Sequence, residues 1–289
     1  MVLPHDELWQ RASTLFLDHN GAHVDALLIG VPASATSISP TNADKTPDAI
    51  REVLAKYSLA HSNSKVDLRK VSIADAGNIV SPDVDEAAAI SLIRNAQSKS
   101  KLLIALGGDN SITYSVFAGV QAEALITLDA HHDLRDGINN GSPVRRIIES
   151  GLSGKKVVQI GIADFSNSPE YVARARDFGI HVISRGALRN RPLEDIWREA
   201  LEVAGTRIHV DFDMDVCDRS VVPACPAAAP GGISADEIRQ FAFLAGQSKN
   251  VISMDITEID STIDTPDART IRLAALVILE AVAGLSTRI

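Results

Sequence analysis

Residues 124–133 read Ala-Leu-Ile-Thr-Leu-Asp-Ala-His-His-Asp, an apolar run that ends in a cluster of acids and histidines. The apolar part, residues 124–128, predicts a buried strand. Side chains alternate between two faces along an extended backbone, so Asp129, His131 and Asp133 are predicted to project to one side just past this strand. Because unpaired buried charge is costly, three such groups in one place predict a bound cation.

A second acidic cluster, residues 211–218, reads Asp-Phe-Asp-Met-Asp-Val-Cys-Asp and follows another apolar strand. The carboxyl ends of parallel strands meet at one edge of an open α/β sheet, so Asp213 and Asp215 are expected to join the first cluster. Oxygen-rich ligation with one imidazole suits Mn²⁺ better than zinc. The carboxylates suffice for two ions that share ligands. The alternative interpretation is a pair of acidic turns with solvated carboxylates.

Two further histidines are expected to serve the core rather than a metal. His132 falls on the face opposite to His131, which predicts a packing residue or a residue that supports a ligand. His209 lies inside a predicted strand, where a histidine usually has its hydrogen bonds satisfied within the core.

The composition restricts the class of protein. The chain has 289 residues, of which 45% are hydrophobic and 22% charged, enough for a sizeable core. Its formal net charge of -9, with no run of Lys or Arg, argues against nucleic acid as a partner. Cys217 and Cys225 form no Cys-x-x-Cys pattern and predict neither a disulfide framework nor a zinc ribbon. The start lacks signal-peptide features and the longest apolar run, residues 273–279, is too short to span a bilayer, so a cytoplasmic protein without a membrane partner is expected.

Short apolar strands alternate with helices along the chain, after a loosely amphipathic arm that extends to about residue 21. The predicted strands are 26–31, 66–73, 101–106, 124–128, 156–161, 180–183, 207–211 and 251–257. The predicted helices are 46–57, with Thr46 as its N-cap, and 83–97, 112–120, 169–178, 193–203, 236–245 and 268–283. This alternation predicts a mostly parallel sheet of about eight strands, covered on both faces. No linker divides the chain, so residues 1–289 are predicted to form one domain. The long polar loop 32–45 is expected to be functional or disordered.

Four ordered motifs carry a family resemblance: Gly107-Gly-Asp-Asn-Ser111, Asp129-Ala-His-His-Asp133, Asp213-Met-Asp-Val-Cys-Asp218 and Asp255-Ile-Thr-Glu258. In order and approximate spacing they resemble the ureohydrolase family, which includes arginase, agmatinase and formimidoylglutamase. The resemblance covers nearly the whole chain. It implies a three-layer α/β/α fold of the arginase type, a binuclear manganese centre, and assembly into homo-oligomers, as trimers or hexamers.

The resemblance also implies roles for the metal-site residues. Asp129, His131, Asp213 and Asp215 would form one metal position. Asp129 and Asp213 would bridge to a second position, which Asp133 completes.

The sequence departs from the family pattern at two positions. One is a ligand of the second metal ion, and the other is the residue that carries a proton during the reaction. The family usually has histidine where this chain has Asn110, and that histidine ligates the second metal. Asn110 is therefore expected to be a weaker ligand, and the second Mn²⁺ is expected to bind loosely. The family also has a proton-shuttling histidine in the loop after the Asp-Ala-His motif; its nearest counterpart here is Asn140. Asp133 is then expected to accept or relay the proton.

The loop sequences resemble the bacterial formimidoylglutamase branch, through Asn140-Gly-Ser-Pro143 and Cys225-Pro-Ala-Ala-Ala-Pro-Gly-Gly232. This implies a hydrolase of carbon–nitrogen bonds in linear amidines that converts the small molecule N-formimino-L-glutamate and water to L-glutamate and formamide, in histidine degradation. The resemblance implies that Glu258 binds the cationic amidine end of the substrate and that Arg135 binds the carboxylate end. Further substrate contacts are expected from Asn139, Asn140 and Asp164, with Ser166 and Asn167 nearby.

Three alternatives stay open at this point. Arg145 and Arg146 could help to bind a dicarboxylate or could form an exposed helix face. The enzyme could be an agmatinase or another guanidino hydrolase that releases urea. The chain could also be an inactive paralogue that acts as a scaffold or regulatory subunit, an interpretation kept open by Asn110 and the missing loop histidine. Retention of the other metal-ligand candidates argues against it.

Overall fold

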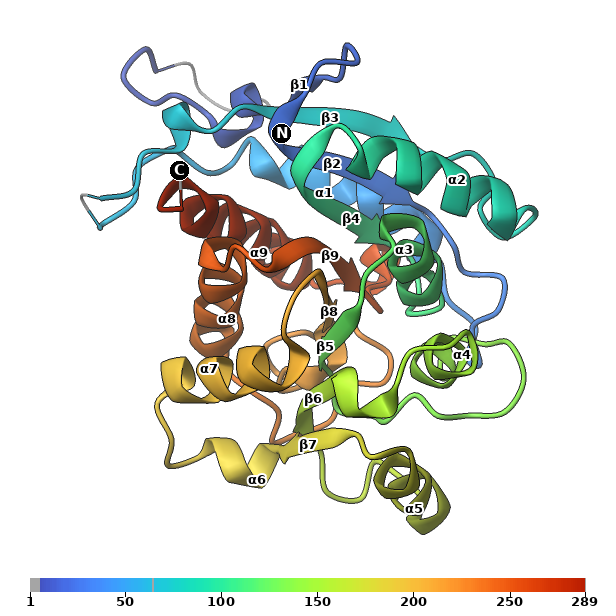
Figure 1. Cartoon of the computed structure of the whole chain (residues 1–289). Helices are drawn as coiled ribbons and strands as arrows, with labels where there is room; N and C mark the ends of the chain where they lie inside the picture. The colour runs from blue at the N-terminus through green and yellow to red at the C-terminus, as the bar shows by residue number, and fades with distance from the viewer. Residues whose placement is uncertain (1–5, 64, 289) are drawn as a thin grey trace.

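The computed structural model describes residues 6–63 and 65–288, and within these residues nine strands form one sheet (Figure 1). The strands are β1 (Leu17–Asp18), β2 (Val24–Val31), β3 (Ile73–Asn78), β4 (Ser100–Gly107), β5 (Ala124–Leu128), β6 (Val157–Ile162), β7 (His181–Ser184), β8 (Ile208–Asp213) and β9 (Val251–Thr257). Their order is β1-β3-β2-β4-β9-β8-β5-β6-β7, and every pair is parallel. The predicted α/β class with a parallel sheet is confirmed, and the edge strand β1 accounts for the difference from eight strands.

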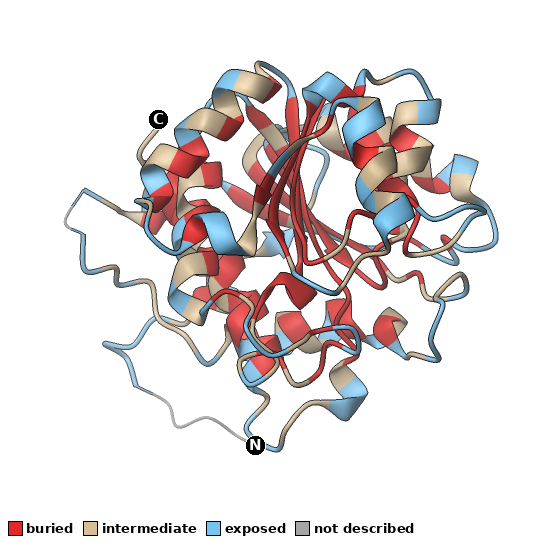
Figure 2. Ribbon diagram, turned by 90° about the horizontal axis from the view of Figure 1, so that it is seen from below, coloured by how far each residue is buried: buried red, intermediate tan, exposed pale blue. Residues whose placement is uncertain are grey.

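Helices cover both faces of this sheet, as Figure 1 shows. The helices are α1 (Thr46–Leu54), α2 (Glu86–Gln97), α3 (Ile112–Val120), α4 (Pro143–Glu149), α5 (Pro169–Phe178), α6 (Arg185–Leu188), α7 (Leu193–Ala204), α8 (Ala235–Gln247) and α9 (Arg269–Ser286). Helices α1, α7, α8 and α9 share one apolar core with the sheet, while α2 and α3 share a second and α4 and α5 a third on the other side. The buried strands lie between these two layers in Figure 2. This is the expected three-layer arrangement.

The two faces of the central strands differ in polarity. On β8, Val210 and Phe212 enter the core under α7–α9, whereas the alternate residues His209, Asp211 and Asp213 turn to the other face. Strand β9 has the same alternation, and the register places Asp211 beside Asp255. The sheet face that leads to the acidic motifs is therefore polar along its centre.

The predicted strand 66–73 was placed too early. Residues 68–70 form a short 3-10 helix, and the strand that pairs with β2 begins at Ile73. The reason is local: the Asp67 carboxylate accepts a hydrogen bond from the Arg69 backbone N–H, which closes a turn where an extended chain was expected.

Helix starts also differ slightly from the prediction. Thr46 is the first helical residue rather than the N-cap, because its hydroxyl donates to the Ile259 carbonyl oxygen at 2.6 Å instead of accepting from its own helix. The helix predicted to start at Asp83 starts at Glu86, capped by Asp85. The Asp83 carboxylate instead accepts hydrogen bonds from the backbone of loop 32–45.

The predicted N-terminal arm contains a short 3-10 helix, Ala12–Leu15, and the edge strand β1, and its first five residues lie outside the described residues. Leu8 and Trp9 are exposed, while Ala12 is buried and its N–H bonds to the Tyr57 carbonyl oxygen. Helix α1 ends at Leu54, before this contact. No helix in the described part of the chain is long and apolar enough to cross a membrane.

Candidate active site and metal centre

Four parallel strands end at the same edge of the sheet, and each is followed by one of the motifs. Strand β4 leads to Gly108–Asn110, β5 to Asp129–Asp133, β8 ends at Asp213, and β9 leads to Glu258. A Cβ at Gly108 would lie 1.8 Å from the Ala33 carbonyl oxygen, so glycine lets the β4 motif approach loop 32–45 closely. The fold thus gathers residues that are far apart in sequence, as predicted.

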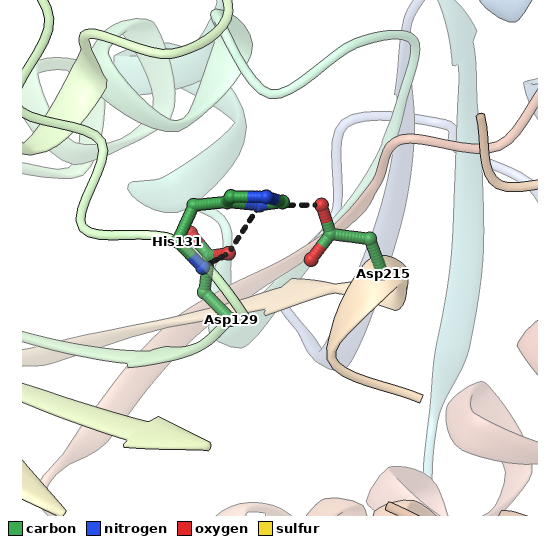
Figure 3. A group of neighbouring side chains, drawn as sticks. All are labelled: Asp129, His131 and Asp215. Carbon is green, nitrogen blue, oxygen red and sulfur yellow. Dashed lines mark hydrogen bonds and ion pairs between the residues drawn. The ribbon is translucent and has the colours of Figure 1, made fainter. Parts of the chain in front are cut away.

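The first cluster consists of Asp129, His131 and Asp215. Figure 3 shows the imidazole of His131 between the two carboxylates, with its Nδ1 2.9 Å from Asp215 Oδ2 and 3.6 Å from Asp129 Oδ1. Both carboxylates are buried and the histidine is partly exposed. One ligand atom from each residue lies within 4.8 Å of the other two, so the three could hold one metal ion.

The second cluster consists of Asp129, Asp133 and Asp213, and its ligand atoms also lie within 4.8 Å of one another. Asp129 belongs to both clusters. A shared carboxylate is what two adjacent ions with a bridging ligand require. The site therefore offers two overlapping positions, one with an imidazole and one made of carboxylates alone.

The backbone that brings Asp133 into this cluster is not the extended chain that the alternation argument assumed. Strand β5 ends at Leu128, the chain bends, and Asp133 has a φ of 52°. Glu258 also lies in the left-handed region, with a φ of 63°. Such conformations cost a non-glycine residue of order 1–3 kcal/mol and are found where surrounding contacts fix them.

The protonation equilibria show how strongly these acids interact. Burial and the Asp215 carboxylate raise the pKa of Asp129 to about 7. Burial and Asp129 raise the pKa of Asp133, and burial and Asp215 raise that of Asp213. Burial alone would lower the pKa of His131, but Asp215 and Asp129 raise it to about 12. Without metal, a proton on His131 partly neutralises an excess of negative charge.

The donor set fits manganese. Asp129 Oδ2 is buried and has no hydrogen-bond partner among the described residues, so it is free to ligate. Carboxylate oxygens with one imidazole suit a hard or intermediate divalent ion, and a dication would compensate the cluster of buried acids.

Asn110 is buried beside the second cluster, but its amide oxygen is turned away from it. Its Nδ2 donates to Asp133 Oδ2 at 2.7 Å, and its Oδ1 accepts from the hydroxyls of Thr113 and Thr257. The expected role of Asn110 as a ligand stays a prediction.

Glu258 is held by two donors that both bond to its Oε1: the Asn110 backbone N–H at 2.7 Å and Asn140 Nδ2 at 2.8 Å. Burial raises the pKa of Glu258 to about 8, although the hydrogen bond from Asn140 acts in the opposite direction. Asn140 also accepts a bond from the Ile38 backbone N–H. Asn140, the nearest counterpart of the missing loop histidine, thus connects its own loop and loop 32–45 to Glu258.

A cavity of about 390 Å³ lies over these groups. It is lined by His131, Asp133, Asp213, Asp215, Glu258, Asn140, Arg135, Ser166 and Asn167, together with residues of loop 32–45 and the previously unassigned Tyr171 and Ser168. Among the described residues that line it, Arg135 is the only lysine or arginine, and it is exposed.

Some predicted substrate contacts do not line this cavity. Asn139 closes the turn of its own loop, because its Oδ1 accepts from Gly141 N–H and its Nδ2 donates to the Asp136 carbonyl oxygen. Asp164 is exposed and lines a different cavity. Neither position favours a contact with a substrate over the metal cluster.

Arg145 and Arg146 have structural partners. Arg145 donates to the carbonyl oxygens of Arg135 and Gly137 and pairs with Glu149. The Arg146 guanidinium lies 3.8 Å from the centre of the Tyr114 ring and forms two hydrogen bonds to Glu86.

The two remaining histidines behave as predicted. His132 Nδ1 lies 2.7 Å from Gln159 Oε1, and burial lowers its pKa. His209 is buried between Ser253 Oγ at 2.9 Å and Asp255 Oδ2 at 3.2 Å. The partner of this histidine, Asp255, is a buried acid. The sequence interpretation quoted Asp255 in the Asp255–Glu258 motif but did not predict its burial or its contact with His209.

Loop 32–45, which was expected to be functional or disordered, forms one wall of the cavity through Ser37, Ile38, Ser39 and Thr41. It is fixed along its length by acidic side chains. Asp83 accepts from the backbone N–H groups of Ser34 and Ala35, Asp109 accepts from the Ser37 hydroxyl, and Asp260 accepts from the Asn42 backbone N–H.

Residues 24–284 match the Arginase family, and the chain belongs to this family. A formimidoylglutamase from Halalkalibacterium halodurans is 37% identical over 295 residues, which cover 95% of this chain and 92% of that protein. The crystal structure of formimidoylglutamase from Bacillus subtilis superposes with a TM-score of 0.91 at 32% identity, covering 99% of this chain and 94% of the other. A formiminoglutamase of Trypanosoma cruzi solved with Mn²⁺ shares the fold, with a TM-score of 0.88 at 24% identity over 97% and 100% of the two chains.

Proposed function

We propose that this protein is a formimidoylglutamase, a manganese-dependent hydrolase that converts N-formimino-L-glutamate and water to L-glutamate and formamide. The similarity to formimidoylglutamases over most of the chain supports this proposal. Within the site, the main support is the distribution of charge in one cavity. Its buried lining residues include metal-ligand candidates and Glu258, and its exposed lining residues include Arg135. That pattern matches a substrate with a cationic amidine end and an anionic end.

Five residues are proposed to hold two ions. Asp129, His131, Asp213 and Asp215 hold the first, and Asp129 and Asp213 also reach the second, which Asp133 completes. The two overlapping clusters that share Asp129 support this assignment. Two Mn²⁺ ions, when bound, supply an activated water molecule and a positive field at the formimino carbon.

Glu258 is proposed to bind the cationic nitrogen of the formimino group. A carboxylate can pair with both N–H groups of an amidinium ion, which fixes the direction of the carbon–nitrogen bond to be broken. The two hydrogen bonds to Oε1 leave the other oxygen of Glu258 available to the substrate.

Arg135 is proposed to bind a carboxylate of the glutamate part, because a guanidinium ion matches the geometry of a carboxylate. Hydroxyl and amide groups of Ser166, Asn167 and Ser37 line the same cavity and can complete the hydrogen bonding. Asn139 and Asp164 are not assigned to this role, because neither lines the cavity.

The overall reaction adds one water molecule across the amidine bond. The bond between the formimino carbon and the glutamate nitrogen breaks, formamide leaves, and the glutamate amine gains a proton. Asp133 lines the cavity and is proposed to accept the proton of the attacking water and to pass it to this amine.

The test is to incubate metal-depleted protein with N-formimino-L-glutamate and graded Mn²⁺, and to measure glutamate and formamide by mass spectrometry. We expect equal amounts of both products and activity that saturates with Mn²⁺. The variant Asp213→Asn should be inactive and serves as the control for contaminating enzymes. Release of urea from agmatine, with no turnover of N-formimino-L-glutamate, would contradict the proposal and assign the protein to the guanidino hydrolases.

Four further expectations from the sequence are proposals. These are a single domain over residues 1–289, two Mn²⁺ ions per chain, a cytoplasmic location, and a homo-oligomer of three or six copies. Light scattering on the purified protein measures the number of copies, and metal analysis of the same sample measures the ions per chain.

A further inference from the structure

Arg135 lies in a short segment, residues 134–137, whose backbone is bonded to the start of the next helix. Its N–H donates to the Gly141 carbonyl oxygen at 2.9 Å, and its own carbonyl oxygen accepts from Arg145 Nε at 2.6 Å. Arg145 belongs to α4 and also donates to the Gly137 carbonyl oxygen. The backbone that presents Arg135 to the cavity is therefore fixed relative to α4.

A second arginine holds the same segment from α5. Arg174 Nη1 donates to the Leu134 carbonyl oxygen at 2.6 Å and to Asp136 Oδ1 at 2.8 Å, and these two residues flank Arg135 in the chain. The Leu134 side chain is buried, whereas Arg135 and Asp136 are exposed. The freedom of this exposed arginine is thus confined to its side chain, because its backbone is held on both sides.

The side chain of Arg135 passes through space that a glycine leaves open. A Cβ at Gly141 would lie 2.7 Å from Arg135 Cδ, 3.1 Å from Arg135 Nε and 3.2 Å from Ile38 Cδ1. Gly141 is buried and its φ is not positive, so alanine can adopt its backbone conformation without strain. Glycine is required here for the space it leaves rather than for its backbone conformation.

The guanidinium group of Arg135 is left for a ligand. It has no ion pair or hydrogen-bond partner among residues 6–63 and 65–288, and it lies in the wall of the cavity. A guanidinium ion pairs with a carboxylate through two parallel hydrogen bonds, which require a defined direction of approach. Displacement of the Arg135 stem would change that direction without removing the charge.

We propose that Gly141 and Arg174 are positioning residues for the Arg135 guanidinium, Gly141 because it leaves room for the side-chain stem and Arg174 because it fixes the backbone on both sides of Arg135. The inference rests on the proposed function, in which Arg135 binds the carboxylate end of the substrate. It makes recognition of the carboxylate depend on a residue without a side chain and on an arginine that does not line the cavity.

The test is a double-mutant cycle on KM for N-formimino-L-glutamate at saturating Mn²⁺, with wild type, Gly141→Ala, Arg135→Ala and the double variant. We expect Gly141→Ala to raise KM about tenfold, the value of roughly one charge-assisted hydrogen bond, with little change in kcat. In the Arg135→Ala background it should leave KM unchanged, because the group that it displaces is gone.

Gly186→Ala is the control for a glycine-to-alanine change. Gly186 is exposed on α6, its φ is not positive, and its Cβ would lie 3.7 Å from Ser184 Oγ, an ordinary contact. It should leave KM unchanged in both backgrounds. An equal rise of KM on Gly141→Ala in both backgrounds would mean that the methyl group obstructs the substrate directly, and would overturn the inference. An unchanged KM in Gly141→Ala would overturn it as well.

Arg174→Gln tests the backbone contacts and serves as the second variant if Gly141→Ala does not fold. It should raise KM by about three- to tenfold in the wild-type background and not in Arg135→Ala. Arg174 also lies 5.5 Å from the ring centre of Tyr171, which lines the cavity, so a rise that persists in Arg135→Ala would overturn the role of Arg174. Arg176→Gln, on the same helix and paired with Asp177 at the surface, is the matched control and should leave KM unchanged.

Crystal structures of the wild type and of Gly141→Ala keep the inference testable without turnover. We expect the same backbone at residues 134–141 in both structures and a different position of the Arg135 guanidinium in the variant. A guanidinium in the wild-type position would overturn the inference. Failure of the wild type to hydrolyse N-formimino-L-glutamate would instead reject the proposed function, whatever the position of Arg135.

Discussion

Asn140 Nδ2 donates a hydrogen bond of 2.8 Å to Glu258 Oε1, although the two residues are 118 positions apart in the chain. The same asparagine accepts from the Ile38 backbone N–H, so it joins the loop after β5, loop 32–45 and the residue proposed to bind the amidine group. The geometry of Glu258 therefore depends on a side chain from another motif.

Replacement of Asn140 by aspartate should lower kcat/KM by about 10- to 100-fold, because a donor to Glu258 becomes a second carboxylate beside it. Steady-state kinetics with N-formimino-L-glutamate measures this loss. The neighbouring variant Asn139→Asp is the matched control, since it adds the same charge one residue away and keeps the bond from the Gly141 N–H, although it loses the exposed bond from Nδ2 to the Asp136 carbonyl oxygen. Equal losses in the two variants would contradict the role assigned to Asn140.

Arg135→Ala should raise KM for N-formimino-L-glutamate by about 10- to 100-fold, because the cavity loses the guanidinium group that pairs with a substrate carboxylate. Arg135→Lys should recover part of this loss. Arg69→Ala, which removes an exposed arginine paired with Asp67, should leave KM unchanged. An unchanged KM in Arg135→Ala would favour a substrate without a carboxylate, such as agmatine.

Mn²⁺ should bind more tightly as the pH rises from 6 to 8. In the metal-free protein the pKa of His131 is raised to about 12, against the effect of burial, by Asp215 and Asp129, so the imidazole is protonated throughout this range. A ligand nitrogen must lose that proton, and the apparent affinity then rises about tenfold per pH unit for each proton released. Calorimetry in buffers of different ionisation enthalpy counts the protons. Release of none would contradict the proposed ligand role of His131.

The metal-free protein should become less stable as the pH rises between about 4.5 and 8. Burial raises the pKa of Glu258 from 4.5 to about 8, so in this window the folded state retains a proton that the unfolded state has lost. The free energy of unfolding therefore falls, by up to about 1.4 kcal/mol per pH unit for one proton.

Urea unfolding with a chelator present measures this slope. Glu258→Gln cannot ionise and should reduce the slope, whereas Glu52→Gln, at an exposed position on α1, should not. A slope that is the same in wild type and Glu258→Gln would show that Glu258 does not hold the proton.

The sequence predicted the central sheet and the metal-ligand candidates more accurately than the bounds of individual strands and helices. The parallel sheet and the convergence of Asp129, His131, Asp133, Asp213 and Asp215 follow from apolar runs that end in acids, because the ends of parallel strands must meet. The error at residues 66–73 arose from a single side chain, Asp67, that closes a turn.

The roles of Asn139 and Asn140 could not be separated from the sequence. The two residues are adjacent and chemically identical, and only the path of the loop decides that Asn139 bonds within its own turn and Asn140 reaches Glu258. The pairing of Asp211 with Asp255 likewise depends on the register of β8 and β9, which periodicity does not give.

The acidic anchors of loop 32–45 have a consequence for the rate at which substrate enters. Asp83, Asp109 and Asp260 hold this wall at both ends and in the middle before any substrate arrives. The anchored residues of the wall are therefore already ordered before the substrate binds, so little conformational entropy is lost there at that step. Entry and release of the substrate then require no rearrangement of the anchored residues.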